Sequence, residues 1–328
     1  MTLSLLIVVL LAVSACDEAD LSAAGAPTAG ASVAAGRALR VSPFDGERAF
    51  RDLVAQVGLG QRHPGSPGSD AVRELIRARL RQAGWSVRDH AFEADLRDGT
   101  HVGMVNLIAE LPGPDRGSVM LVTHYDTKRL PQVPEFVGAN DGASGVAVLL
   151  ELARVLPRQP RALGHQLVFF DGEEAVGPNI GSIDGLYGSR ALAAKMREEG
   201  TLADVRALVL IDMVGDADLN LSWGADSAPD LVAPWIELAR RSGVALEGPM
   251  SLVDDHLPFV DAGVPRVLSL IDFHYGDRTS PGWRWHTRGD GLEAVSAASL
   301  NSVGSLLVEW LARVEPQLAG KQGANAGR

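Results

Sequence analysis

Residues that could bind a metal ion recur along this 328-residue chain, and several of them follow short apolar runs. His124 and Asp126 stand in HYDTK, and Asp141 stands in the glycine-rich turn GANDGASG. Asp212 closes the run LVLID, and His286 stands in WRWHT. Each residue alone is compatible with a surface turn or a helix cap. Their chemistry therefore depends on whether the fold brings them together.

Two adjacent glutamates, Glu173 and Glu174, follow a fully apolar run in FFDGEEA. Burying two like charges is costly unless a cation compensates them. Neighbouring side chains point in different directions, so one glutamate can bind metal while the other acts on substrate as an acid or base. With the histidines and aspartates they form a nitrogen and oxygen ligand set without a thiolate, which suits a hydrolytic type of zinc site.

The elements that must position these residues are strands alternating with helical patterns. This alternation predicts an α/β fold with a mostly parallel central sheet and helices on both faces. The expected core strands are residues 105–109, 119–123, 167–170, 207–211 and 267–271. Four of them are followed by a ligand or an acid, namely His124, Asp171, Asp212 and Asp272. Because ligands bind at the carboxyl ends of strands in such sheets, we expect one shared crevice there.

Three helices are predicted, over residues 69–83, 145–156 and 297–314. The first has an apolar stripe opposite basic residues, which indicates a surface helix. The second is apolar nearly all round, which indicates a buried crossover helix.

The N-terminus has an apolar run from Leu3 to Val13, followed by Ser14, Ala15 and Cys16, which is typical of an export signal. Small residues before a cysteine resemble a bacterial lipobox, so we expect lipidation of Cys16. The alternatives to a lipoprotein signal are an ordinary secretory signal with a chance cysteine, or a wrongly assigned start codon. The chain would then be exported and lipid-anchored to a bacterial membrane, facing the periplasm or the exterior.

The expected organisation is a signal over residues 1–16, an Ala/Gly/Ser-rich tether over 17–42, one catalytic domain over 43–315 and a frayed tail over 316–328. No apolar run reaches the length of a membrane span. The formal net charge of −11 argues against nucleic acid as a partner. Because Cys16 is the only cysteine, it leaves neither an internal disulfide nor a cysteine nucleophile. Motifs of the H-E-x-x-H, G-x-S-x-G, P-loop and G-x-G-x-x-G types are absent.

The chain resembles the animal-type zinc-dependent glutaminyl-peptide cyclotransferases, which share a zinc exopeptidase-like fold with leucyl-type zinc aminopeptidases. The resemblance rests on the order and spacing of RHPGSPGS, NLIAELPG, HYDTK, NDGASGVAVLLELAR, LVFFDGEEA, DGLYGSRALA, LVLIDMVGD, DDHLPF, AGVPRVL and WHT. It implies cyclisation of the N-terminal Gln of peptides with release of ammonia. One departure is AVGPNIG after the glutamates, where the family has a pocket tryptophan.

The resemblance also implies roles for individual residues. One zinc ion would be held by Asp141, Glu174 and His286. Glu173 would transfer the proton. Asp254 and Asp212 would stabilise the leaving nitrogen by sharing a proton. Trp285 would wall the substrate pocket. Independently of the resemblance, the spacing of HYDTK predicts that Asp126 orients His124.

Two alternatives remain open at this point. A dinuclear aminopeptidase would hold a second zinc ion on His124 and Asp212 and would remove N-terminal residues by hydrolysis. In a cyclase we expect His124 to be turned away from the zinc. A tethered binding protein without catalysis is the third interpretation, although the complete ligand and acid set argues against it.

Overall fold

The computed structural model describes residues 42–277 and 279–320. The predicted signal with Cys16, nearly all of the predicted tether and the last eight residues of the chain lie outside these ranges. Among the helices of the described ranges, none is long and apolar enough to cross a membrane.

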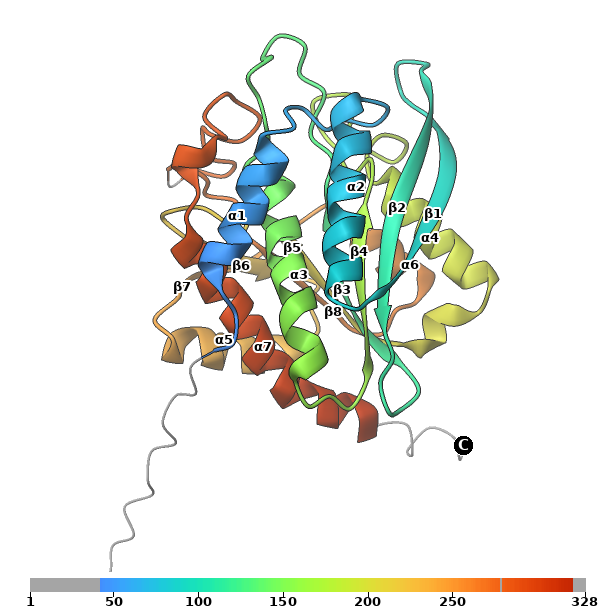
Figure 1. Ribbon diagram of the computed structural model, residues 1–328, viewed down its shortest axis with the longest axis vertical. Helices are drawn as coiled ribbons and strands as arrows, with labels where there is room; N and C mark the ends of the chain where they lie inside the picture. Colours follow the sequence, from blue (N-terminus) through green and yellow to red (C-terminus); the bar gives the residue numbers. More distant parts are fainter. Residues whose placement is uncertain (1–41, 278, 321–328) are drawn as a thin grey trace, which may run out of the picture. The chain divides into compact units, whose positions relative to one another are not determined.

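A central eight-stranded sheet organises the molecule (Figure 1). Its strands are β1 (Ser86–Asp95), β2 (His101–Leu111), β3 (Ser118–His124), β4 (Gly164–Phe170), β5 (Val205–Asp212), β6 (Asn220–Gly224), β7 (Ala245–Met250) and β8 (Val267–Ile271). The order across the sheet is β1-β2-β4-β3-β5-β8-β6-β7. The central strands β4, β3, β5 and β8 are parallel, β1 and β2 form an antiparallel edge, and β6 runs antiparallel to β8. The predicted α/β class with a mostly parallel central sheet is confirmed.

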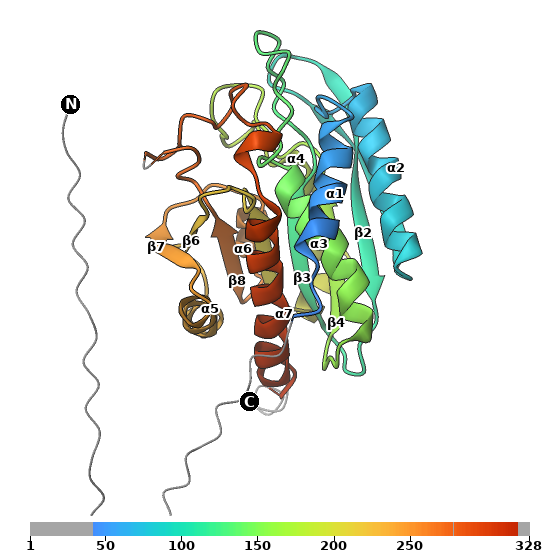
Figure 2. The same cartoon turned by 60° about the vertical axis from the view of Figure 1, so that its left-hand side comes forward.

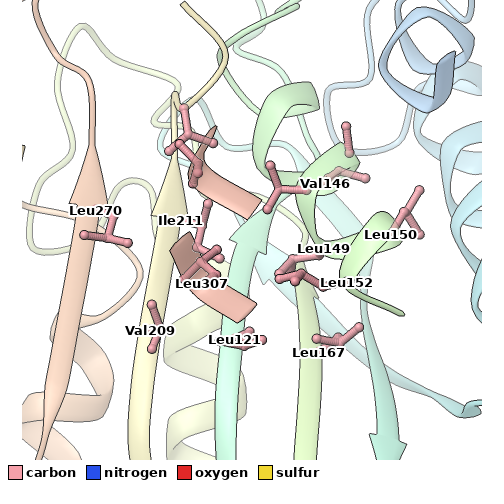
Figure 3. Close-up of a cluster of buried hydrophobic side chains, with 14 of the residues drawn as sticks. Leu121, Val146, Leu149, Leu150, Leu152, Leu167, Val209, Ile211, Leu270 and Leu307 are labelled. Carbon is pink, nitrogen blue, oxygen red and sulfur yellow. The ribbon is translucent and has the colours of Figure 1, made fainter. Parts of the chain in front are cut away.

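Helices cover both faces of the sheet (Figure 2). They are α1 (Gly46–Val57), α2 (Pro67–Gln82), α3 (Ala143–Val155), α4 (Tyr187–Glu198), α5 (Pro229–Arg241), α6 (Leu257–Ala262) and α7 (Ala297–Gly320). One core cluster joins side chains of α1, α2, α3, α5 and α7 to one face, and a second joins α4 and α6 to the other. Figure 3 shows part of the first cluster, in which Val146, Leu149 and Leu152 of α3 pack with residues of the central strands such as Leu121 and Leu167.

The central strands are apolar on both sides because each face is covered. Along β3, Leu121 belongs to the first core cluster, whereas Met120 and Val122 belong to the second. Successive side chains of a strand point to opposite faces, so a strand buried on both sides is a continuous apolar run. This explains why the five core strands are recognisable from sequence.

The β1–β2 hairpin extends beyond the rest of the sheet. Strand β2 pairs with β4 only from Leu107 to Leu111, but it pairs with β1 from His101 onwards. The free part of the hairpin therefore projects past the carboxyl end of β4. Strand β1 is an edge strand with mostly exposed side chains, and such strands carry little apolar signal. Strands β1, β6 and β7 were not predicted from the sequence.

The predicted helices are confirmed in type, with shifted ends. Helix α3 begins at Ala143 and α2 at Pro67, each two residues earlier than expected. The expectation of a frayed tail from residue 316 is wrong over its first part, because α7 continues to Gly320. The reason is burial: Leu318 is only 4% exposed and belongs to the first core cluster.

Candidate active site

Two clusters of ligand atoms share Asp141 at the carboxyl edge of the parallel strands. The first is Asp141, Glu174 and His286, and the second is His124, Asp141 and Asp212. Within each cluster the ligand atoms lie within 4.8 Å of one another. All the site residues named as metal candidates therefore lie in one place.

In the first cluster, two carboxylates converge on one nitrogen of His286. His286 Nε2 lies 3.0 Å from Glu174 Oε1 and 3.3 Å from Asp141 Oδ2. Burial lowers the pKa of His286, but the carboxylates of Glu174 and Asp141 outweigh this effect and raise the pKa to about 9. Burial raises the pKa of Asp141, but the nearby imidazoles of His124 and His286 favour its ionised form more strongly, so its pKa falls well below the usual range.

The residues of the first cluster fit a zinc ion. They supply one nitrogen and two carboxylate groups, a set that zinc accepts with a fourth position left open. The Oδ2 atom of Asp141 is buried without a hydrogen-bond partner. Such an unpartnered buried oxygen is costly in an apo protein and is satisfied when a cation binds.

The second cluster corrects one expectation about His124. Its Nε2 atom lies 3.3 Å from Asp141 Oδ1 and 3.2 Å from Asp212 Oδ1. The ring is therefore turned toward the ligand cluster and not away from it. The reason is that β3 and β5 are paired neighbours, so that His124 and Asp212, at their carboxyl ends, face the same crevice.

Local backbone geometry places Asp141 and His286. Gly142 has φ of 92°, and a Cβ there would lie 2.7 Å from the carbonyl oxygen of Asp126, so only glycine fits this close approach. His286 itself has φ of 55°, a left-handed conformation that is uncommon for this residue type. Such strain is found where surrounding contacts hold a functional side chain in place.

Asp126 connects the two halves of the site. Its carboxylate accepts hydrogen bonds from the backbone N–H groups of Glu173, at 3.0 Å, and Glu174, at 3.3 Å. It also lies 3.5 Å from Nδ1 of His124. No hydrogen bond joins Asp126 to this nitrogen, so the orientation of His124 by Asp126 stays a prediction. Asp126 does position both glutamates, which the sequence did not indicate.

Glu173 is buried among charged neighbours. It is 7% exposed, and its Oε2 atom lies 4.0 Å from Nδ1 of His124. Burial and the charges of Glu174, Asp254 and Asp255 raise its pKa well above the ordinary value, against the effect of His124. A carboxyl group with a raised pKa can hold or release a proton near neutral pH.

Asp254 also belongs to this group of acids. It is 4% exposed, and burial together with the charge of Asp212 raises its pKa well above the ordinary value. The next residue, Asp255, is fully buried, and neither carboxylate oxygen has a hydrogen-bond partner. The site therefore holds more acids than the ligand set needs.

Trp285 covers one ligand of the first cluster. Its ring stacks on the imidazole of His286, with centroids 3.7 Å apart, and contacts Phe273 edge-on. The side chain is half-buried. This position is compatible with the expected pocket wall, and it also restricts the orientation of His286.

Two acids predicted for the shared crevice lie outside both ligand clusters. Asp171 accepts a hydrogen bond from the backbone N–H of Val105 and lies 3.4 Å from Arg73 Nη1. Asp272 accepts from the backbone N–H groups of Asn220 and His274. Their position after β4 and β8 is as expected, but Oδ2 of Asp171 and both oxygens of Asp272 bind adjacent segments, so we correct their assignment to the shared site.

Some supporting residues were missed from the sequence. Asp290 accepts hydrogen bonds from the backbone N–H groups of Asn140 and Asp141, at 2.7 and 3.1 Å, and from the hydroxyl of Tyr275. Its place in WHTRGD, close to His286, was the available signal. Lys128 donates to the carbonyl of Ala175 at 2.7 Å.

The buried Arg62 also supports the site. It is fully buried, and its guanidinium donates to the carbonyl oxygens of Tyr125, Val137 and Gly138. These contacts join both ends of the loop between β3 and α3. This loop carries Asp126 and leads to Asp141.

Comparison with known proteins agrees with this geometry. The model of peptidase family M28 matches residues 106–311. The glutaminyl-peptide cyclotransferase of Boiga irregularis is 33% identical over 290 residues, which covers 76% of this chain and 76% of its relative.

Solved structures give the same result. A glutaminyl cyclase from an Acidobacteriales bacterium is 35% identical with a TM-score of 0.78, and the match covers 89% of this chain and 100% of the other. The glutaminyl cyclase of Porphyromonas gingivalis is 30% identical with a TM-score of 0.73, over 82% and 98% of the two chains. The chain thus belongs to peptidase family M28 and, within it, to the glutaminyl-peptide cyclotransferases.

Proposed function

We propose that this protein is a zinc-dependent glutaminyl-peptide cyclotransferase, which converts the N-terminal Gln of peptides to pyroglutamate and releases ammonia. The observation that carries the proposal is the buried carboxyl group of Glu173 beside the cluster of Asp141, Glu174 and His286. It is supported by relatives named glutaminyl-peptide cyclotransferase that match 76% of the chain.

Asp141, Glu174 and His286 would hold one zinc ion. When bound, the ion supplies Lewis-acid polarisation of a carbonyl oxygen. The substrate would place its side-chain amide carbonyl there and its α-amine near Glu173. Trp285, stacked on His286, would form one side of the pocket that receives the glutamine side chain.

Glu173 would move the proton. A bond forms between the α-amine nitrogen and the side-chain carbonyl carbon, and the bond from that carbon to the amide nitrogen breaks. Glu173 takes a proton from the attacking amine and returns it to the departing nitrogen, which leaves as ammonia. A carboxyl group suits both steps when burial and neighbouring acids raise its pKa.

Asp254 and Asp212 would stabilise the leaving nitrogen. Both are buried, and the charge of Asp212 raises the pKa of Asp254 in addition to the effect of burial. Two buried carboxyl groups at short range cannot both ionise, so Asp254 and Asp212 would share a proton. The acid pair would hold the leaving nitrogen by a hydrogen bond, while Glu173 alone supplies the proton that makes it ammonia.

The direct test combines metal analysis with two assays on the purified protein. We expect about one zinc per chain, release of ammonia from N-terminal Gln peptides and a pyroglutamyl product by mass spectrometry. Two tightly bound metal ions with hydrolysis of leucine amide and no cyclisation would refute the proposal.

The alternative function is a dinuclear zinc aminopeptidase. It is favoured by one observation, the position of His124 within 3.3 Å of Asp141 and 3.2 Å of Asp212. A second ion there would neutralise Asp212 without Asp254. Zinc titration followed by both assays separates the two functions, because only the aminopeptidase would need the second equivalent.

We further propose that the chain is exported and anchored by a lipid on Cys16. The support is the apolar run before Cys16, which lies outside the described residues. The substitution Cys16→Ser should release the protein from the membrane fraction. Unchanged association after this substitution would favour an uncleaved signal anchor instead.

A further inference from the structure

A groove with a volume of about 280 Å³ lies between the loop after β3 and the loop after β4. One wall is the segment 128–132 and the other is the segment 176–178. Arg129 and Val176 also line a smaller cavity of about 30 Å³, whose wall includes Glu174. Arg129 and Val176 therefore stand between the groove and the cavity that the candidate metal ligand Glu174 lines.

The tip of the β1–β2 hairpin contacts both walls of this groove. Arg97 lies 3.7 Å from the buried Asp184, which accepts hydrogen bonds from the backbone N–H groups of residues 176 and 177. The adjacent Asp98 forms an ion pair with Arg129 on the opposite wall. Two neighbouring residues of opposite charge therefore link the hairpin tip to both loops.

The charged residues that line the groove are both cationic, Lys128 and Arg129. Lys128 is buried and already occupied, since it donates to the carbonyl of Ala175 and lies 3.5 Å from Glu174 Oε2. Arg129 is different: its side chain is 38% exposed and its partner Asp98 is 32% exposed. An exposed ion pair is weak, and a guanidinium has five N–H donors. Arg129 can therefore donate hydrogen bonds to a second carboxylate as well.

The chemistry of the substrate indicates what binds in the groove. The α-amine and the side-chain amide of the N-terminal Gln must both lie at the reacting centre, so only the chain after this residue leaves it. We propose that the groove binds the residues that follow the N-terminal Gln, and that Arg129 selects peptides with an acidic side chain there. This rests on the proposed cyclotransferase function.

The test compares kcat/KM for three substrates: Gln-Glu-Ala amide, Gln-Lys-Ala amide and glutamine amide. The wild-type enzyme should prefer the acidic peptide over the basic one by about fivefold at low salt, and the preference should shrink at high salt. Arg129→Glu should reverse the preference. Asp98→Asn removes the internal partner of Arg129 and should increase it.

Arg116→Glu is the matched control. Arg116 also forms an exposed ion pair, with Asp204 at 2.9 Å, but it lies before β3, whereas Arg129 lies after it. The substitution Arg116→Glu should therefore leave the preference unchanged. Equal kcat/KM for the two peptides in the wild type would overturn the proposal. The proposal would also be overturned if Arg129→Glu and Asp98→Asn did not shift the preference for the acidic peptide in opposite directions. Inactivity toward glutamine amide as well would refute the proposed function, whereas activity without preference refutes only the groove.

Discussion

Strand β4 has a histidine–carboxylate pair near each end, and the two pairs differ. At its amino end, His165 Nε2 lies 2.6 Å from Glu315 Oε1, and Glu315 Oε2 accepts hydrogen bonds from the backbone N–H groups of Ala162 and Leu163. Beyond its carboxyl end, His286 Nε2 lies 3.0 Å from Glu174 Oε1.

The difference lies in what surrounds each pair. The Glu315 carboxylate has one histidine and two neutral backbone donors, so it is satisfied within the protein. Near Glu174, by contrast, Asp141 offers a buried oxygen without a hydrogen-bond partner, and Glu173 and Asp254 add further acids. A surplus of converging acids, rather than a histidine beside a carboxylate, indicates a metal and proton-transfer site.

The largest expected effect is that of Glu173→Gln at the carboxyl end of β4. The amide keeps the shape of the side chain but cannot transfer a proton, so kcat should fall by about 10²–10⁴. Zinc content and the melting temperature should remain those of the wild type. A matched control, Glu315→Gln, should leave kcat unchanged.

Two outcomes would contradict this role for Glu173. A variant with near wild-type turnover would remove Glu173 from the proton transfer. Loss of zinc from the same variant would mean that the roles of Glu173 and Glu174 are exchanged.

A smaller effect, on stability alone, is expected from Glu315→Ala at the amino end. The substitution leaves His165 and two backbone N–H groups without their acceptor, at a cost of about 2–4 kcal/mol in the free energy of unfolding. Urea unfolding measures this cost. Specific activity per folded molecule should not change, and a loss of zinc would show that the two ends are coupled.

The smallest expected effect is a pH dependence of zinc affinity. In the metal-free protein the pKa of His286 is raised to about 9, so at pH 7 zinc must displace a proton from it. Apparent zinc affinity should therefore rise about tenfold per pH unit from pH 7 and level off above the pKa. Competition with a chelator of known pH dependence measures the slope.

The control for this measurement is His165→Ala, which should leave the slope unchanged. A zinc affinity that does not vary between pH 7 and the pKa of His286 would show that the ring is already neutral in the metal-free protein. The contrast between the two pairs would then rest on geometry alone.

The site candidates show how far local sequence reasoning reaches. His124 and Asp212 each follow an apolar run, and pairing of β3 with β5 makes them neighbours as expected. Asp171 and Asp272 follow equally apolar runs, yet their oxygens bind backbone N–H groups of adjacent segments. A sequence pattern gives the end of the strand but not the direction of the side chain, because that direction depends on contacts from other segments.

Sequence alone determined the α/β class, the core strands and the types of ligand at their carboxyl ends, because an apolar run buried on both faces is a local property. Tertiary structure decided what depends on distances of a few ångströms between remote segments. Asp290 holds the backbone of Asp141, the left-handed backbone of His286 aims its ring at Glu174, and the β1–β2 hairpin reaches the loop of Arg129. Such contacts arise from loop closure and strand register across the whole domain, which no local pattern contains.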